Sequence, residues 1–495
     1  MVQQSPYALA VDAGTSSLKA VVYAADGTVI GTATQRYTYR ADQPGWAEAD
    51  PRQWWTAFET ATAELRAAGL ALDQLKAVAF TGQMHTAVLL DSDNQPLDPT
   101  ILWLDRRAAA ETAELVAALN LPPYQLNSTY TLPKLVWLHR HRPETVRRIR
   151  TILWPKDYLR FQLTGDLCTD TTEPGGAALL NWGTTTWAAE RLEWAGLSPS
   201  VLPTIRKSAD VVGHPRREVA QRLGLAPDAA VIAGVGDVAA LISGAPPKPG
   251  RVISSLGSSS MVFAALAAGQ APHDAAERLY TYPLLEPYRL FGGVSSTTGA
   301  ALVWAFDALG RRAIGEAFAE AVTQASTLEP GAGGLCFIPY LAGERSPFWS
   351  DDLRAGFYGL QLSHDWRHML RAVLESIAFS LRHLLDIYAE LNVPVTELAL
   401  AGGGTKTPGL CQVIADVCQK DVAIYTEDET VTRVLYALCR AGVDRADFGR
   451  SLLATFPPPD TVPCNPQLGQ AYGLAYEKYR RFVDFAVQEA ASRAR

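Results

Sequence analysis

Two short turns of glycine and hydroxyl residues each lie between apolar, strand-like stretches of the chain. The first turn contains Gly14, Thr15 and Ser16, and the second contains Gly257, Ser258 and Ser259. Backbone N–H groups and hydroxyls at the tip of such a turn can bind phosphate oxygens. Either turn alone is ordinary turn chemistry. Their matching positions after matching strands predict instead that both turns bind one polyphosphate.

An acidic residue precedes only the first of the two turns. Asp12 lies two residues before Gly14, and the second turn has no acid at the matching place. A carboxylate would repel phosphate unless a divalent cation lay between them, so Asp12 is predicted to serve Mg2+ directly or through water. The alternative is a turn Asp that caps Thr15 or Ser16. The chain has no GxxxxGK[ST] sequence, which excludes a P-loop protein.

A second acid follows an apolar strand and a pair of glycines in "VIAGVGDVAALISGA", where Asp237 begins an expected helix. A carboxylate at a strand end that faces a cleft can accept the proton of an attacking hydroxyl. Simple capping of the helix N-terminus is an equally good interpretation. Spacing alone does not separate a general base from a cap.

A third strand end, in "AFTGQMHTAVLLD", carries Met84 and His85, and the nearby "ILWLDRRA" supplies Trp103 and Asp105. Polar groups beside Met and Trp suit a small polyhydroxylated ligand, which needs hydrogen bonds at its edges and apolar surface against its carbon faces. A lone His is more often a core residue, so the position of His85 supports this interpretation rather than its type.

Three consecutive glycines, Gly402, Gly403 and Gly404, lie between an apolar strand and a helix in "LALAGGGTKTPG". Such a run lets the backbone approach a flat ligand such as adenine. A tight strand-to-helix turn is the alternative.

The elements that must position these residues alternate between strand and helix patterns, which predicts an α/β architecture. Strands are expected in "YALAVDAG", "LKAVVYAADGTVIGTATQ" and "LKAVAFTGQ", and a helix in "DPRQWWTAFETATAELRAAG". The Pro- and Gly-rich segment 243–251 is a predicted linker, after which the strand–turn–strand order restarts. We therefore expect two related domains, 1–245 and 246–485, with the active site in the cleft between them.

Composition limits the function classes. The chain has 495 residues, a net charge of −7 and no run of Lys or Arg, which argues against a nucleic-acid partner. No apolar run reaches membrane-spanning length and the start lacks the features of a signal peptide, so a cytoplasmic protein without a membrane partner is expected. The six cysteines have no CxxC spacing, which favours reduced thiols over disulfides or a zinc site.

Several longer strings resemble a known family. "AGFYGLQLSHDWRHMLRAVLES" resembles the C-terminal signature of the FGGY-type carbohydrate kinases, and "TLPKLVWLHRH" resembles the N-terminal one. "TGQMH", "GWAEADPRQWW", "ILWPKDYLRFQLTGDLCTD" and "FIPYLAGERSP" are similar to the branch of that family that acts on D-xylulose. The resemblance covers nearly the whole chain. It implies two ribonuclease-H-like domains, as in actin and hexokinase, with ATP and sugar in the cleft.

The resemblance also implies roles for the residues described above. Asp237 would be the catalytic base and contact the sugar, Asp12 would be the acid associated with Mg2+, and Met84 and His85 would contact the sugar together with Trp103 and Asp105. The nucleotide ATP would be bound by Gly14, Thr15, Ser16, Gly257, Ser258, Ser259, Gly299, Gly402, Gly403 and Gly404. A homodimer is usual among such kinases.

The expected function is ATP-dependent phosphorylation of D-xylulose to D-xylulose 5-phosphate. Two departures from the family pattern bear on it: Val238 replaces the Asn that commonly follows the catalytic Asp, and Val434, Leu435 and Tyr436 replace a Gly-Ala-Ala helix segment. Another FGGY substrate, such as ribulose, a deoxyketose, a polyol or gluconate, is the first alternative. A non-catalytic nucleotide sensor on the same fold is the second.

Overall fold

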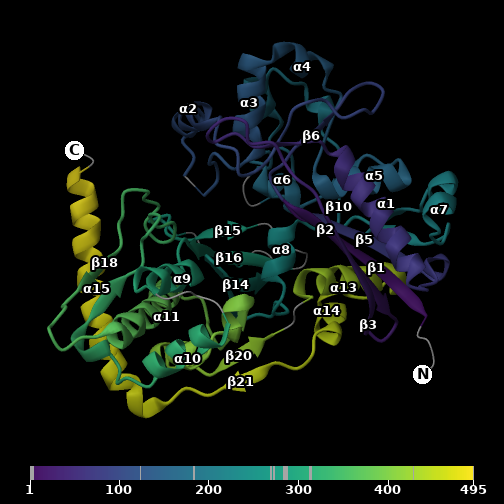
Figure 1. Ribbon diagram of the computed structural model, residues 1–495. Coiled ribbons are helices and arrows are strands. Elements are labelled where there is room, and N and C mark those ends of the chain that lie inside the picture. Colours follow the sequence, from purple (N-terminus) through teal and green to yellow (C-terminus); the bar gives the residue numbers. More distant parts are fainter. Residues whose placement is uncertain are drawn as a thin grey trace. The chain divides into compact units, whose positions relative to one another are not determined.

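The computed structural model describes residues 5–122, 124–181, 184–267, 270, 272, 274–282, 288–310, 315–426 and 429–493. The chain forms two compact units (Figure 1). Unit 1 contains the chain up to Pro246 together with Glu429–Phe456, and unit 2 contains most of the rest.

The described part of unit 1 is built on a six-stranded sheet. Its strand order is β11 (Val211–Gly213), β12 (Ala230–Ile232), β5 (Ala77–Gly82), β1 (Pro6–Ala13), β2 (Ser17–Ala24) and β3 (Val29–Arg36). The strands β12, β5 and β1 are parallel, whereas β1, β2 and β3 form antiparallel hairpins. The carboxyl ends of the three parallel strands therefore meet at one edge of the sheet, which is where α/β proteins bind ligands.

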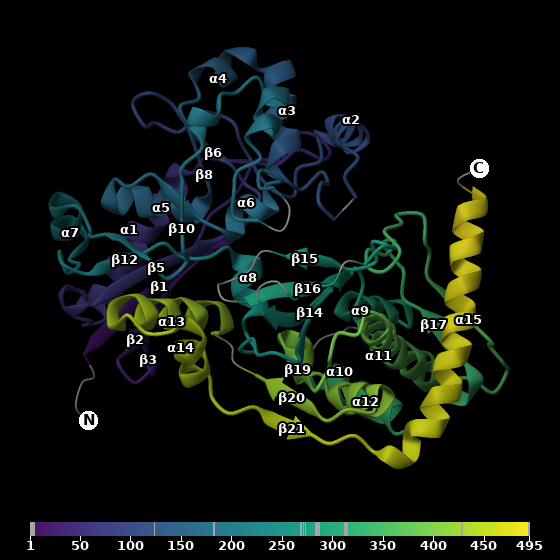
Figure 2. The same ribbon diagram turned by 180° about the vertical axis from the view of Figure 1, so that it is seen from behind.

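Helices cover both faces of this sheet. On one face, α1 (Arg52–Ala67), α5 (Pro155–Thr164) and α7 (Arg217–Leu223) share a core with the strands. Trp54 and Phe58 of α1 are fully buried there, as the apolar spacing of the predicted helix requires. The opposite face packs against α13 (Thr430–Asp444), which lies beside β1 in both views (Figures 1 and 2).

The rest of unit 1 forms a second apolar core, which includes Trp137 and Trp154. Its helices are α2 (Ala109–Leu119), α3 (Thr131–His141) and α4 (Pro143–Arg148). Small two-stranded sheets pair β4 (Glu48–Ala49) with β7 (Thr100–Ile101), β6 (Val88–Leu90) with β8 (Thr151–Leu153), and β9 (Cys168–Asp170) with β10 (Thr204–Arg206). The short helices α6 (Thr172–Gly176) and α8 (Asp237–Ile242) complete the unit with α14 (Phe448–Thr455).

The segment Glu429–Phe456 differs from the predicted division into 1–245 and 246–485, because it belongs to unit 1. The bulky residues of α13 explain this placement. Tyr436 is buried, stacks on Tyr23 of β2 at a ring-centroid distance of 4.9 Å, and donates a hydrogen bond to the Ala25 carbonyl at 2.8 Å. Tyr436, one of the bulky residues that replace the Gly-Ala-Ala segment, thus packs against the sheet of unit 1.

Unit 2 repeats the same sheet. Its described strands are ordered β15 (Tyr280–Tyr282), β16 (Tyr288–Ser295), β14 (Ser260–Ala267), β13 (Arg251–Leu256), β19 (Glu397–Ala401), β20 (Val422–Tyr425) and β21 (Asp460–Val462). The hairpin β13–β14 and the parallel run β13–β19–β20 have the order and directions of β1–β2 and β1–β5–β12. The predicted α/β class with two related domains is confirmed.

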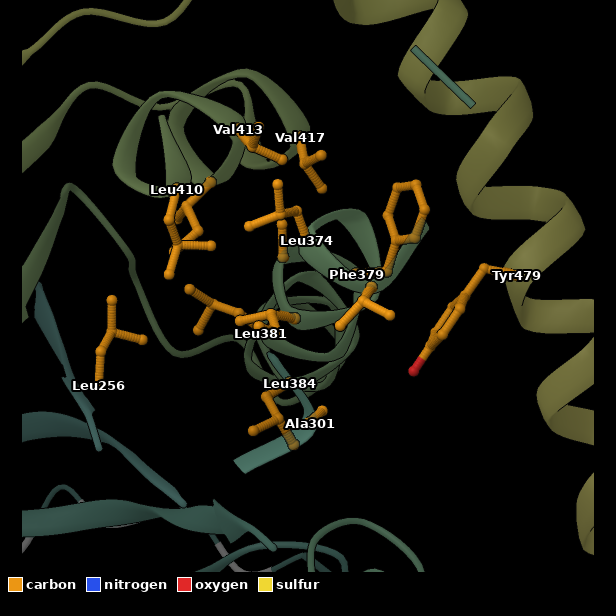
Figure 3. Close-up of a cluster of buried hydrophobic side chains, with 14 of the residues drawn as sticks. Leu256, Ala301, Leu374, Phe379, Leu381, Leu384, Leu410, Val413, Val417 and Tyr479 are labelled. Atoms are coloured by element: carbon orange, nitrogen blue, oxygen red, sulfur yellow. The ribbon is translucent and has the colours of Figure 1, made fainter. Parts of the chain in front are cut away.

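The core of unit 2 is centred on the long helix α11 (Trp366–Glu390). It packs with α9 (Gly299–Ala308), α10 (Gly315–Ser326), α12 (Leu410–Cys418) and α15 (Gly469–Arg493), and with the hairpin β17 (Cys336–Ile338) and β18 (Gly356–Tyr358). Figure 3 shows side chains of α11 among those of its neighbours, labelled Leu374, Leu381, Leu384, Leu410, Val413 and Leu256. This core holds the start of α9 and the end of β13 in place.

Two predictions from composition can be compared with the structure. All six cysteines are free thiols, as expected, and burial raises the pKa of Cys168 to about 12. Within the described ranges, no helix is both long and apolar enough to cross a membrane.

Candidate active site

The strand ends of unit 1 bring the predicted acids and the Met–His pair together. Strands β1 and β5 run side by side with Asp12 opposite Thr81, and the Gln83 N–H donates to the Ala13 carbonyl at 2.9 Å. The next peptide, Met84, donates its N–H to Oδ1 of Asp237 at 3.3 Å. The end of β1, the end of β5 and the start of α8 therefore form one continuous hydrogen-bonded edge.

Asp12 lies near the end of β1, next to the first turn. Its Oδ1 is buried and has no hydrogen-bond partner among the described residues. Burial raises the pKa of Asp12 to about 6, and the neighbouring Lys19 partly opposes this, whereas Glu429 adds to it. No cap to Thr15 or Ser16 is observed, so the orphaned oxygen fits a hard cation better than a turn cap.

Asp237 is the first residue of α8 and lies at the same edge. Its Oδ1 accepts hydrogen bonds from the N–H groups of Val238 at 2.7 Å and Met84 at 3.3 Å. Burial raises the pKa of Asp237 to about 7, the Asp12 carboxylate adds to the increase, and the two N–H groups oppose it. A carboxyl with a pKa near neutrality suits a general base.

This pKa predicts the pH dependence of the reaction. Asp237 must be deprotonated to accept a proton, so kcat/KM should rise with pH up to about 7 and then level off. A carboxylate with the ordinary pKa of about 3.9 would leave the rate constant over the same range. Initial rates measured between about pH 5 and pH 9 in buffers of matched ionic strength decide between the two, and a flat profile down to pH 5 would contradict the assignment.

Met84 and His85 pack closely against small residues. A Cβ added to Gly236 would lie 2.7 Å from Sδ of Met84, and one added to Gly176 would lie 2.4 Å from Cε1 of His85. The His85 ring also packs on Tyr130 at 4.8 Å between centroids. Burial lowers the pKa of His85 to about 3, with a further contribution from Lys134, so the ring is neutral. A neutral imidazole can exchange hydrogen bonds with hydroxyl groups.

Trp103 and Asp105 occupy different surroundings. Trp103 is 36% exposed, and its Nε1 donates to the hydroxyl of Thr15 in the first turn at 3.0 Å. Asp105 is fully buried, and its carboxylate accepts hydrogen bonds from Arg107 and from the Ala47 N–H. Both carboxylate oxygens of Asp105 have protein donors, and its contact with the sugar stays a prediction.

The first turn is held by backbone hydrogen bonds on its inner side. The Gly14 N–H donates to the Ser17 carbonyl at 3.0 Å, and the Tyr37 hydroxyl donates to the Gly14 carbonyl at 2.7 Å. Tyr37 also donates its N–H to the Ser16 carbonyl at 3.1 Å. These contacts fix the turn while the Thr15 and Ser16 residues form its tip.

In unit 2 the second turn meets the other predicted glycines. The Gly299 N–H donates to the Gly257 carbonyl at 2.9 Å, and an added Cβ on Gly299 would lie 2.6 Å from that oxygen. Gly402 has φ +89° and approaches the Leu256 carbonyl, and Gly404 approaches the Leu256 side chain. The turn at Gly257, the single Gly299 and the run Gly402–Gly404 therefore all lie at the end of β13 and the N-terminus of α9.

The two turns differ at the position of the acid for a visible reason. Ser255, two residues before Gly257, occupies the place that Asp12 has before Gly14. The Ser255 hydroxyl accepts a hydrogen bond from the Met261 N–H at 3.2 Å. In unit 2 the Ser255 hydroxyl thus has a backbone partner. In unit 1 the matching residue, Asp12, has a carboxylate oxygen without a hydrogen-bond partner among the described residues.

Sequence reasoning missed two charged residues beside Asp12. Lys19 lies opposite Asp12 in the β1–β2 register and forms an ion pair with Glu429, at the start of α13. The hairpin spacing around Gly14 could have located Lys19. No sequence signal connects Glu429 with this site, because the two segments meet only in the folded unit.

The part of the chain that the structure describes contains no group of three or more His, Cys, Asp or Glu side chains that could hold a metal ion. Mg2+ is commonly bound by only one or two carboxylates with water and substrate phosphates, so the single oxygen of Asp12 is compatible with it.

The chain is similar to known sugar kinases. A xylulose kinase of Lactococcus lactis is 31% identical over 438 residues, which cover 86% of this chain and 85% of that protein. The crystal structure of xylulose kinase from Rhodospirillum rubrum has a TM-score of 0.88 at 27% identity, covering 98% of this chain and 99% of that chain. A gluconokinase of Bacillus subtilis is 27% identical, covering 84% of each.

Family models cover most of the sequence. Residues 7–244 match the N-terminal domain of the FGGY family of carbohydrate kinases, and residues 252–433 match its C-terminal domain. The turns, strand ends and acids described above lie within these two ranges, and the chain belongs to the FGGY family of carbohydrate kinases.

Proposed function

We propose that this chain phosphorylates the terminal primary hydroxyl of D-xylulose, with ATP as donor and Mg2+ as the metal, and yields D-xylulose 5-phosphate. Family membership makes the chain an ATP-using phosphotransferase with an alcohol acceptor. The choice of D-xylulose is supported by the relatives named xylulose kinase. The observation that carries the chemistry is the buried Asp237 carboxyl, with its raised pKa, beside Met84.

Asp237 would accept the proton of the sugar hydroxyl as its oxygen attacks the γ-phosphorus. The peptide N–H groups of Met84 and Val238 orient the receiving carboxylate. Neutral His85 and the apolar Met84 would bind the sugar, and Trp103 would cover it from the side of the first turn. Proton acceptance by a positioned base contributes about 10²–10⁴-fold to such a transfer.

Asp12 would hold the metal, because its buried Oδ1 has no hydrogen-bond partner among the described residues and carboxylate oxygen is a preferred ligand of Mg2+. The bound ion would neutralise charge on the transferring phosphoryl group. The N–H groups and hydroxyls of the two turns, with the glycines at the start of α9 and after β19, would bind the nucleotide. A homodimer stays a prediction of the resemblance, and a cytoplasmic location stays a prediction from the sequence features.

A panel of acceptors tests the substrate. Purified protein with Mg2+ and ATP is assayed for ADP release with D-xylulose, D-ribulose, a deoxyketose, a polyol and gluconate. We expect the highest kcat/KM with D-xylulose. Faster turnover of gluconate would replace the proposed substrate and agree with the gluconokinase relative. Binding of Mg2+–ATP without ADP release from any acceptor would indicate a nucleotide sensor.

Val238 predicts a weakness in D-xylulose binding. It is half-buried beside Asp237, where an Asn could hydrogen-bond a sugar hydroxyl and Val cannot. Val238→Asn should lower the KM for D-xylulose about 2- to 10-fold without a matching change in kcat, since a neutral hydrogen bond contributes about 0.5–1.5 kcal/mol. Val238→Leu is the matched control, because it changes shape without adding a polar group. Equal KM values for the parent and the Asn variant would show that Val238 serves only in packing.

A further inference from the structure

Thr172 holds the peptide that precedes Asp237. The Gly236 N–H donates to the Thr172 hydroxyl oxygen at 2.8 Å. The same hydroxyl donates to Oδ2 of Asp170 at 2.7 Å, and the Thr172 N–H donates to that oxygen at 3.1 Å. Thr172 and Asp170 are fully buried. One hydroxyl thus accepts a hydrogen bond from Gly236 and donates one to Asp170. A fixed Asp170 therefore also fixes the peptide at the start of α8.

Asp170 is fixed in turn by buried polar groups. Nζ of Lys156 lies 3.0 Å from Oδ1 of Asp170 and 2.6 Å from Oδ1 of Asp157. The Ser208 hydroxyl donates to Oδ2 of Asp170 at 2.8 Å. The side chains of Lys156, Asp157 and Asp170 are all 0% exposed. Water therefore does not compete for these contacts. Oδ2 of Asp170 accepts the hydrogen bonds from Thr172 and Ser208, whereas Oδ1 has an ion pair with Lys156 and no hydrogen-bond partner among the described residues.

The same ionic network holds the other end of the segment that leads to Asp237. Arg160, also fully buried, pairs with Asp157 at 3.0 Å and donates to the Ala233 carbonyl at 2.5 Å. Between these two anchors, the Gly234 N–H donates to the Ser208 carbonyl at 3.0 Å. The backbone from residue 233 to residue 236 is thus held at each end by side chains of one network.

The network contains two cations and two carboxylates, so its charges cancel; they are Lys156, Arg160, Asp157 and Asp170. Glu173 lies among them without a hydrogen-bond partner for either oxygen in the described structure. Burial raises the pKa of Glu173 well above its ordinary value, which disfavours a fifth charge in the network. Buried ion pairs are weak contributors to net stability but can specify one arrangement of the chain. The arrangement specified here is the path of residues 233–236.

We propose that Thr172 is a positioning residue for phosphoryl transfer, which orients Asp237 through the Gly236 peptide and is itself anchored by the buried network of Lys156, Asp157, Arg160 and Asp170. The proposal rests on the role of Asp237 as the base. Loss of the hydroxyl frees the peptide on the N-terminal side of Asp237. A shift of about 1 Å in a reacting group can cost about 100-fold in rate.

The test compares Thr172→Val with Thr172→Ser. The Val variant keeps the shape but removes the hydroxyl, and its kcat in the ADP-release assay should fall at least about 10-fold while the KM for ATP stays within about twofold. Thr172→Ser restores the hydroxyl and should recover most of the parent kcat. Thr62→Val is the matched control, because Thr62 is also fully buried but, among the described residues, its hydroxyl bonds only to the Glu59 carbonyl of α1.

Equal kcat values for Thr172→Val and Thr62→Val would overturn the proposal, as would a Ser variant that is no faster than the Val variant. If circular dichroism shows that Thr172→Val does not fold, Ser208→Ala is measured instead, because it removes a donor from the same Asp170 oxygen. A lower kcat in Ser208→Ala would then support the proposal, and an unchanged kcat would overturn it. The parent's preferred sugar tests the proposed substrate, whereas the ratio of variant to parent tests Thr172. If the parent acts only on another sugar, the D-xylulose proposal is wrong. The ratio of the Thr172→Val kcat to the parent kcat can still be measured with that sugar.

Discussion

Replacing Asp237 with Ala should lower kcat by about 10²–10⁴-fold, the usual contribution of a positioned general base. The variant loses the only carboxylate that accepts the N–H groups of both Met84 and Val238 in the described structure. The KM for ATP should change little, because the predicted nucleotide-binding glycines of unit 2 are untouched.

The measurement is single-turnover and steady-state ADP release with saturating sugar and nucleotide, with nucleotide affinity determined separately by titration. Asp228→Ala, at an exposed acid of the same unit, is the control and should match the parent. Near-parent turnover in Asp237→Ala would rule out the role of base and leave Asp237 as a helix cap, the alternative that spacing alone left open.

Asp12→Asn should produce the second large effect, a loss of about 10²-fold or more in kcat/KM at a fixed, moderate Mg2+ concentration. A neutral amide oxygen binds Mg2+ more weakly than a carboxylate, and a metal that neutralises transferring phosphoryl charge contributes several kcal/mol. Activity measured against increasing Mg2+ should show a requirement shifted to higher concentration. A chelator should abolish parent activity, and added Mg2+ should restore it.

Stability provides an independent readout for Asp12. Its pKa is raised in the folded unit, so the ionised form is disfavoured there, and this cost is present above about pH 6 and relieved as the pH falls through that value. Asp12→Asn should therefore raise the melting temperature of the metal-free protein at pH 8 and have less effect at pH 5. An unchanged Mg2+ requirement in this variant would contradict the assignment of the metal to Asp12, even if the stability increases.

Much of unit 1 could be predicted because its signals are local. The turn at Gly14 lies between two strands that pair with each other, so short-range alternation and a glycine were enough to predict the hairpin. The helix that became α1 has its apolar residues spaced for one face, and Gly69, with φ +89°, follows its end. The repeat of this order in unit 2 predicted the second sheet.

The roles of individual polar residues depended on contacts between distant segments. Asp105 was predicted to contact the sugar because it is a polar residue near Trp103, but in the fold Arg107 and the Ala47 N–H hydrogen-bond to its two oxygens. Thr172 lies in a stretch without a recognisable motif, yet its hydroxyl accepts a hydrogen bond from Gly236, 64 positions later in the chain.

Strand periodicity and turn chemistry act over a few residues, so the α/β class and the duplicated strand–turn–strand order could be predicted from the sequence. The positions of Asp12 near the end of a strand and of Asp237 at the start of a helix were predictable for the same reason. Which polar groups have partners depends instead on contacts between distant segments, such as the packing of α13 on the sheet of unit 1 and the ion pair of Glu429 with Lys19. Burial and charge are properties of the folded surroundings. The raised pKa values of both acids, and the network that anchors Thr172, arise only when segments far apart in the chain exclude water together.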